Sequence, residues 1–212
     1  MGAPGHTTPL RSATFGNLQL NAGIFIANAD YSSIANATAL KTAIQNLVSG
    51  TTTALGTSAK LLGATRGGGS FTVTRELRQP DVDGRRYGFK GDTFVDSVDA
   101  QLSTTLVEIT LDTWKNAFGA FTATGSSPKQ TLKLNTAIAT ADYLTNVCWI
   151  GDLADGQLVL ICIKNTINEA DITLTFTDKG EGTIPVEFHA KQAGVSDYDT
   201  APFEIVYFTP AT

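Results

Sequence analysis

The feature that most constrains the fold is an alternation of side-chain character at residues 71–76. Phe71, Val73 and Arg75 alternate there with Thr or Glu, a period of two residues. This period places successive side chains on opposite faces of a β-strand. The chain also contains 31 Thr, and branching at Cβ favours strands over helices. We therefore expect a mainly β protein.

Other runs rich in Thr, Val, Leu and Ile predict further strands. We expect them near residues 15–20, 23–27, 86–90, 95–111, 131–134, 144–150, 157–164, 172–177, 184–189 and 203–209. Asp83-Gly84 and Asp155-Gly156 are typical of tight turns between strands, because Gly accepts a positive φ. The first turn is expected to set the register between the strand at 71–77 and the strand at 86–90.

Two segments have a helical pattern instead. Apolar residues spaced by four, seven and eight predict a helix at about 36–49, with Ser33 or Asn36 as its N-cap. A shorter helical turn is expected at 112–118, where Trp114 and Phe118 lie four residues apart and should form its buried face.

With 212 residues, of which 42% are apolar, the chain can bury a sizeable core. No break in composition divides it, so we expect one domain over 1–212. Residues 1–13 are rich in Gly, Pro and Thr and are expected to form a flexible arm. Residues 50–70 combine many Gly and Thr with little apolar periodicity, which predicts a long loop that orders on assembly.

The charge balance disfavours several functions. A formal net charge of −5 is unsuited to a protein that grips phosphate backbones. No apolar run approaches the ~20 residues of a membrane-spanning helix. The first residues lack the basic and apolar segments of a signal peptide, so we expect a soluble protein made in the cytoplasm.

Residues that could carry catalysis are sparse. Cys148 and Cys162 lie in apolar runs without zinc-ligand spacing, and two buried free thiols are the favoured interpretation; a disulfide between neighbouring strands is the alternative. Glu187 and His189 share one face of a strand and could form an acid–base pair, but polar residues on a wet face are more common. The glycines at 67–69 lack the Lys-Ser/Thr ending of a phosphate loop. We expect no enzyme, no cofactor and no metal.

Several pieces of the chain, in order, resemble the major tail (tail tube) proteins of long-tailed bacteriophages. The first piece is Leu62-Gly63-Ala64-Thr65-Arg66-Gly67-Gly68-Gly69-Ser70-Phe71-Thr72-Val73, followed by Arg75-Glu76, Asp83-Gly84-Arg85, Lys90-Gly91 and the run from Ala100 to Glu108-Ile109-Thr110. A second piece is Ile184-Pro185-Val186-Glu187-Phe188-His189-Ala190, followed by Asp197–Asp199 and Ala201-Pro202-Phe203-Glu204-Ile205. Together they cover roughly a third of the chain. The helix at 36–49 has no counterpart in this pattern.

The resemblance implies a β-sandwich or half-barrel subunit whose sheets join between subunits into a hexameric ring. Stacked rings would form the tail tube of a virion, assembled in the cytoplasm of the bacterial host. Its partners would be further copies of itself and the tape measure, tail terminator and distal tail proteins. Double-stranded DNA would pass through the tube without specific binding, along strands expected at 71–77 and 101–111.

The interface residues expected under this resemblance come from the long loop, the strand after it and the turn. They are Leu61, Leu62, Arg66, Gly67, Gly68, Gly69, Arg75, Glu76, Arg78, Asp83, Gly84 and Arg85. The arginines are expected to pair with carboxylates between subunits rather than to face the DNA.

Two alternatives stay open. A tube protein of a contractile tail or of a tail-like secretion system would share the fold and differ in partners. A carbohydrate-binding or adhesion β-sandwich would expose aromatic side chains along a groove, although aromatic residues are only 8% of the chain.

Overall fold

The computed structural model describes residues 18–19, 21–84, 86–119, 121–176, 178–197 and 199–211. Its strands are β1 (Ile24–Ala27), β2 (Lys60–Leu61), β3 (Thr65–Arg78), β4 (Phe94–Leu106), β5 (Phe121–Ser126), β6 (Lys129–Leu134), β7 (Leu144–Asp152), β8 (Leu158–Asn168), β9 (Ile184–His189) and β10 (Phe203–Phe208). Its α-helices are α1 (Ala37–Val48) and α2 (Leu111–Phe118), and two 3₁₀ turns, η1 and η2, cover Thr140–Asp142 and Val195–Asp197. The expectation of a mainly β protein is confirmed.

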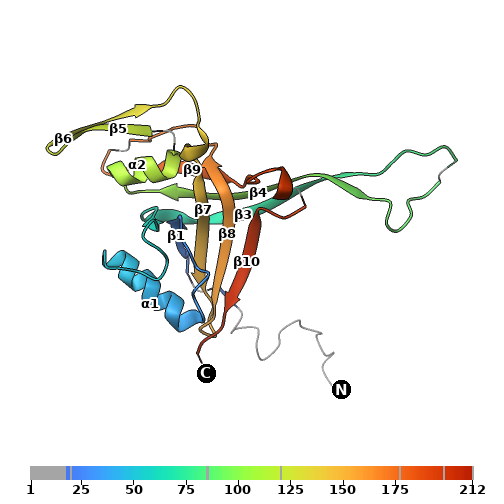
Figure 1. Ribbon diagram of the computed structural model, residues 1–212, viewed down its shortest axis with the longest axis horizontal. Helices are drawn as coiled ribbons and strands as arrows, with labels where there is room; N and C mark the ends of the chain where they lie inside the picture. The colour runs from blue at the N-terminus through green and yellow to red at the C-terminus, as the bar shows by residue number, and fades with distance from the viewer. Residues whose placement is uncertain are drawn as a thin grey trace, which may run out of the picture.

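Eight strands form one antiparallel sheet in the order β2-β1-β7-β8-β9-β4-β3, with β10 paired to β8. Strand β8 pairs with β7 along most of its length and with β10 over its first residues. Only its last two residues, Ile167 and Asn168, pair with β9. The sheet therefore bends after β8, and β3 and β4 cross over β7 and β8 (Figure 1). Strands β5 and β6 form a separate hairpin.

The two faces of β1, β7 and β8 are covered by different elements. On one face, Phe25, Val147 and Ile163 pack with Leu102 of β4 and Phe188 of β9. On the other face, α1 contributes part of a second cluster of buried side chains (Figure 1). Alternate side chains of these strands thus enter two different cores, which is why residues 147–150 of β7 and residues 158–163 of β8 are apolar at every position.

Helix α1 confirms the predicted helix at 36–49 and its Asn36 cap. The Oδ1 atom of Asn36 accepts a hydrogen bond from the backbone N–H of Ala39 at 2.9 Å, which satisfies one of the free amides of the first turn. Leu40 and Ala43 are buried against the sheet. Val48, which the spacing places on the same face, is exposed at the end of the helix.

Helix α2 confirms the helical turn predicted at 112–118. Thr110 caps it by accepting a hydrogen bond from the N–H of Thr113 at 3.0 Å. The rings of Trp114 and Phe118 stack with centroids 5.3 Å apart. Phe118 is buried as predicted, whereas Trp114 packs against the core and is only partly buried.

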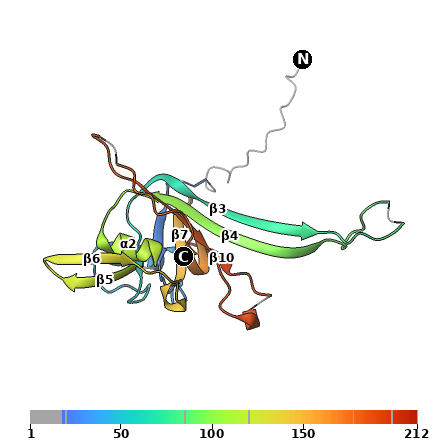
Figure 2. The ribbon, with the colours of Figure 1, turned by 90° about the horizontal axis from the view of Figure 1, so that it is seen from above.

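The hairpin of β3 and β4 extends well beyond the rest of the molecule (Figure 2). A turn at Asp83-Gly84 with a positive φ at Gly84 was expected, and both are present. The prediction that this turn directly joins two paired strands is wrong, because β3 ends at Arg78 and the returning strand begins only at Phe94. Residues 86–90 form no strand. The register is set by fourteen-residue and thirteen-residue strands that pair along their length, so the turn does not need to fix it.

The long loop predicted at 50–70 is also wrong in large part. Residues 60–61 form β2 and residues 65–70 begin β3. Leu55 is fully buried in the cluster under α1. Apolar side chains spaced irregularly gave no periodic signal, yet each reaches a different part of the core.

Most of the other predicted strands are confirmed, with shifted ends. Those at 23–27, 131–134, 144–150, 157–164, 184–189 and 203–209 correspond to β1, β6, β7, β8, β9 and β10. The strand predicted at 95–111 ends at Leu106, and β5 was missed. The strand predicted at 172–177 is wrong: in the described part of that segment only Thr175 forms a bridge, with Thr183. The flexible N-terminal segment predicted at 1–13 and most of the strand predicted at 15–20 lie outside the described residues.

The turn at Asp155-Gly156 between β7 and β8 is confirmed, since the N–H of Gly156 donates to the carbonyl oxygen of Leu153 at 3.0 Å and Gly156 has a φ of +87°. This hairpin places Cys148 directly opposite Cys162. Both are buried free thiols, as expected, and burial raises the pKa of Cys148 well above its ordinary value.

Candidate assembly surface

The protruding part of the β3–β4 hairpin, residues 74–99, is here called the arm. Its root is the point where β9 stops pairing with β4: the last pair of those two strands joins Gln101 to His189. One residue beyond it the N–H of Ala190 donates to the carbonyl oxygen of Ala100 at 2.9 Å, and from Asp99 outward β4 pairs only with β3 among the described strands. On its other edge, away from β4, β3 has no partner strand among the described residues.

One face of the hairpin, the apolar face, continues the core outward. Its cross-strand pairs are Phe71–Leu102, Val73–Ala100, Arg75–Val98 and Leu77–Val95. Leu102 and Ala100 are 2% and 1% exposed, whereas Val98, Val95 and Leu77 are 43%, 53% and 54% exposed. The apolar pattern thus runs past the end of the body, where nothing in the described chain covers it.

The opposite face, the polar face, carries hydroxyl, amide and carboxylate groups. Its cross-strand pairs are Ser70–Ser103, Thr72–Gln101, Thr74–Asp99 and Glu76–Ser97. The hydroxyl of Ser97 donates to Oε2 of Glu76 at 3.1 Å, so this predicted interface residue lies on the polar face and is bonded within the arm.

The arginines of the predicted interface are used in three different ways. Arg78 forms an ion pair with Asp96 across the hairpin, with Nε and Oδ2 2.9 Å apart, and lies over the ring of Phe94. Arg66 pairs with Glu181 of the loop before β9. Arg75 lies on the apolar face, and no described residue supplies an ion pair for it.

The tip of the arm holds the remaining predicted residues. Asp83 and Gly84 lie in an exposed turn, and Gly84 has a φ of +82°. Arg85 lies outside the described residues. Near them, Val82 and Phe89 are 60% and 74% exposed, so the tip presents further uncovered apolar surface.

The three glycines predicted as loop residues form an irregularity within β3. Thr65 pairs with Leu106 and Gly69 with Thr104, so β3 contains two extra residues there. Gly67 and Gly68 both have a φ of +76°, which other residues adopt only with strain. Extra residues of this kind bend the strand and increase its twist, and here they lie at the start of the long hairpin.

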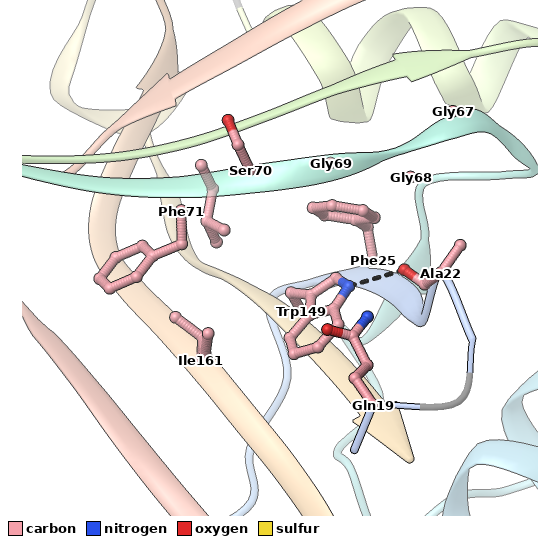
Figure 3. A pocket seen from close by; sticks show the side chains of 11 residues that line it. Gln19, Ala22, Phe25, Gly67, Gly68, Gly69, Ser70, Phe71, Trp149 and Ile161 are labelled. Carbon is pink, nitrogen blue, oxygen red and sulfur yellow. Dashed lines mark hydrogen bonds between the residues drawn. The ribbon is translucent and has the colours of Figure 1, made fainter. Parts of the chain in front are cut away.

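A cavity of about 580 Å³ lies beneath these glycines, between β3 and the inner face of β1, β7 and β8. Phe25, Phe71 and Ile161 line it together with Trp149 (Figure 3). The indole Nε1 of Trp149 donates to the carbonyl oxygen of Ala22 at 2.9 Å. The walls of this cavity are mostly apolar. The cavity lies where β3 crosses β1 and β7.

At Gly69, the backbone of β3 lies very close to Phe25 of β1 and to Ser103 of β4. A Cβ at Gly69 would lie 2.5 Å from Cζ of Phe25 and 2.6 Å from the carbonyl oxygen of Ser103, whereas a Cβ at Gly194 would meet nothing within 4 Å. We expect Gly69→Ala to reduce the free energy of unfolding by about 1–3 kcal/mol through overpacking. Gly194→Ala, the control, should leave the free energy of unfolding nearly unchanged, since the added Cβ meets no atom and Gly194 has no positive φ. Urea denaturation measures both, and equal losses would contradict the close approach.

Leu61 and Leu62 were expected to anchor the next ring, and the structure corrects this for Leu62. Leu62 is fully buried in the core beside Phe25, and Leu61 packs against the cluster under α1. Both leucines therefore pack within the subunit itself, and the N–H of Leu62 donates to the carbonyl oxygen of Phe25 at 3.1 Å.

On the polar side of β9, His189 contacts two carboxylates, and the sequence indicated only one of them, Glu187. His189 and Glu187 share a face as expected, with Nε2 and Oε1 3.1 Å apart. Nδ1 of the same ring lies 3.0 Å from Oδ1 and Oδ2 of Asp99. Asp99 is 90 residues away in sequence, so only the pairing of β4 with β9 brings it to His189.

No group of three or more metal-ligating side chains occurs among the described residues. Within the same ranges, no helix is long and apolar enough to cross a membrane. The comparisons with known proteins add no relative: no protein-family model and no curated protein matches the chain.

Proposed function

We propose that this chain is a tail tube protein of a long-tailed bacteriophage, whose copies form stacked hexameric rings around the path of the genome. The observation that carries the proposal is the arm, which is apolar on one face, polar on the other and uncovered on both. A single subunit exposes Val98, Val95 and Leu77 on it. Burying the exposed half of each would contribute roughly half of the ~1.5–3 kcal/mol gained when a fully exposed side chain is buried.

The free edge of β3 supports the same proposal. A strand of fourteen residues that leaves its backbone groups unpaired is a template for pairing with another chain. From Ser70 to Arg78 this edge contains no proline, and its one irregularity, between Glu76 and Leu77, places the extra residue on β4 rather than on the free edge. In a ring, each subunit would offer this edge to its neighbour, and the heterologous contact would close on itself.

The polar face would then line the channel. Ser, Thr, Gln, Asp and Glu side chains on β3 and β4 make up most of this face; its basic groups are His189 at the arm root and Arg78, which is paired with Asp96. Six copies with a formal charge of −5 each would carry about −30 per ring. Such a surface repels phosphates weakly, whereas an arginine-lined channel would bind the duplex by releasing counterions.

The half-barrel fold implied by the resemblance fits this arrangement. β9, β4 and β3 would contribute their polar faces to a continuous inner barrel, and β1, β7 and β8 with α1 would form the outer layer. A tube of a contractile tail would use the same surfaces with a different outer partner.

The direct test is electron microscopy of the concentrated, purified protein in negative stain, with sedimentation velocity on the same sample. We expect rings or tubes with a central channel and species of about six subunits. A stable monomer at every concentration would contradict the proposal and favour a binding or adhesion module. Solid particles without a channel would also contradict it.

A further inference from the structure

His189 lies at the root of the arm. It is the last residue of β9 and pairs with Gln101 of β4. Asp99 lies two residues before Gln101, toward the tip of the arm, and faces the polar side; between them the N–H of Ala190 donates to the carbonyl oxygen of Ala100 at 2.9 Å. A contact between His189 and Asp99 therefore joins the supported part of the hairpin to the arm.

The contacts of His189 require a particular protonation state. Nδ1 lies 3.0 Å from both carboxylate oxygens of Asp99, and Nε2 lies 3.1 Å from Oε1 of Glu187. A neutral imidazole donates from one nitrogen only, whereas the imidazolium ion donates from both. Both contacts are hydrogen bonds only when His189 is charged.

We propose that His189 is a pH-sensitive clasp: in its protonated form it donates to both Asp99 and Glu187 and fastens the root of the arm to β9, and on losing its proton it donates to only one of these carboxylates, which weakens the fastening. The root is then held mainly by the β3–β4 pairing and by the backbone hydrogen bond from the N–H of Ala190 to the carbonyl oxygen of Ala100 at 2.9 Å. This device belongs to the free subunit, so it stands whether or not copies of the chain form a tube.

The other charged groups around the ring act in the same direction. Glu169, beyond the end of β8, contributes a further negative charge, although its Oε1 lies 2.5 Å from Nζ of Lys191. Opposite Asp99, β3 places Thr74, which does not titrate. The carboxylates thus outnumber the single nearby ammonium group.

The direction of the pH dependence follows from these groups. Burial lowers the pKa of His189, but the hydrogen bonds with Asp99 and Glu187 outweigh it and raise the pKa above its ordinary value of 6.5. A raised pKa means that protonation stabilises the folded clasp. This contribution is complete below pH 6.5 and is lost as the pH rises through the pKa of the folded state.

Nuclear magnetic resonance on the full chain, kept dilute enough to be monomeric, tests the clasp directly. Long-range proton–nitrogen spectra should show both ring nitrogens of His189 protonated at pH 6, with a midpoint above 6.5. Amide-exchange protection at residues 94–99, corrected for intrinsic rates, should fall about tenfold across that midpoint, as expected for one hydrogen bond to a charged group. A midpoint below 6.5, or protection that ignores it, would overturn the proposal.

Variants separate the clasp from general loosening. Asp99→Asn should lower the midpoint of His189 and give low protection at 94–99 at every pH, and His189→Gln should give the same low, pH-independent protection. Asp96→Asn is the matched control, because that carboxylate lies on the same strand but pairs with Arg78. It should keep the midpoint of His189. A control that shifted the midpoint as much as Asp99→Asn would overturn the assignment.

Discussion

Replacing Leu77 and Val95 together by aspartate is expected to abolish assembly while leaving the subunit folded. The two residues form a cross-strand pair on the apolar face of the arm and are 54% and 53% exposed. Their loss removes little buried surface from the monomer, so its melting temperature should change by no more than a few degrees. In a ring they would place two carboxylates in an apolar contact, where an unpaired charge costs several kcal/mol.

The measurement is sedimentation velocity together with negative-stain microscopy, beside circular dichroism of the same samples. The matched control adds the same two charges to a cross-strand pair of the polar face, as Thr72→Asp with Gln101→Glu. It should assemble like the unaltered protein. If both double variants stayed monomeric, net charge rather than the apolar face would control assembly, and the role given to the arm would be wrong.

Deleting residues 53–66 is expected to unfold the protein. The Gly and Thr content predicted a long loop here, and removal of such a loop would have left a folded subunit that no longer assembles. The structure places Leu55, Ala59 and Leu62 of this segment in the core, each at most 3% exposed. Truncating a buried leucine costs about 2–5 kcal/mol, and two such losses approach the ~5–15 kcal/mol that stabilise a whole domain.

Circular dichroism and thermal unfolding of the soluble fraction measure this effect. The control shortens the true loop at the arm tip by replacing residues 80–92 with Asn-Gly. Gln79 Nε2 donates to Thr93 Oγ1 at 3.1 Å, so the ends are close enough for a two-residue turn. This control should fold. A cooperative transition in the 53–66 deletion variant, near that of the control, would show that the segment does not contribute to the core.

Predictability differed between segments for a physical reason. Helix α1 and strands β7, β8 and β9 were predictable because their local patterns agree with their burial. Asn36 caps α1 where its apolar periodicity begins. The central residues of β7 and β8 are apolar on both faces of the sheet. Leu55 and Leu62 were not predictable, because each is buried by elements distant in sequence and neither belongs to a regular pattern. The strand predicted at 172–177 has the right residue types but no strand edge beside it.

In the candidate assembly surface, too, some features followed from local sequence patterns and others depended on contacts between distant segments. The alternation at 71–76 determined that the segment is a strand with one polar face, and the composition determined that the protein is mainly β. Only the tertiary structure decided that this strand leaves the body, since that depends on where β9 ends and β4 continues. It also brought Asp99 to His189 and buried Leu62. A sequence pattern encodes which side chains share a face, whereas the element that covers the face is set by pairing between strands far apart along the chain.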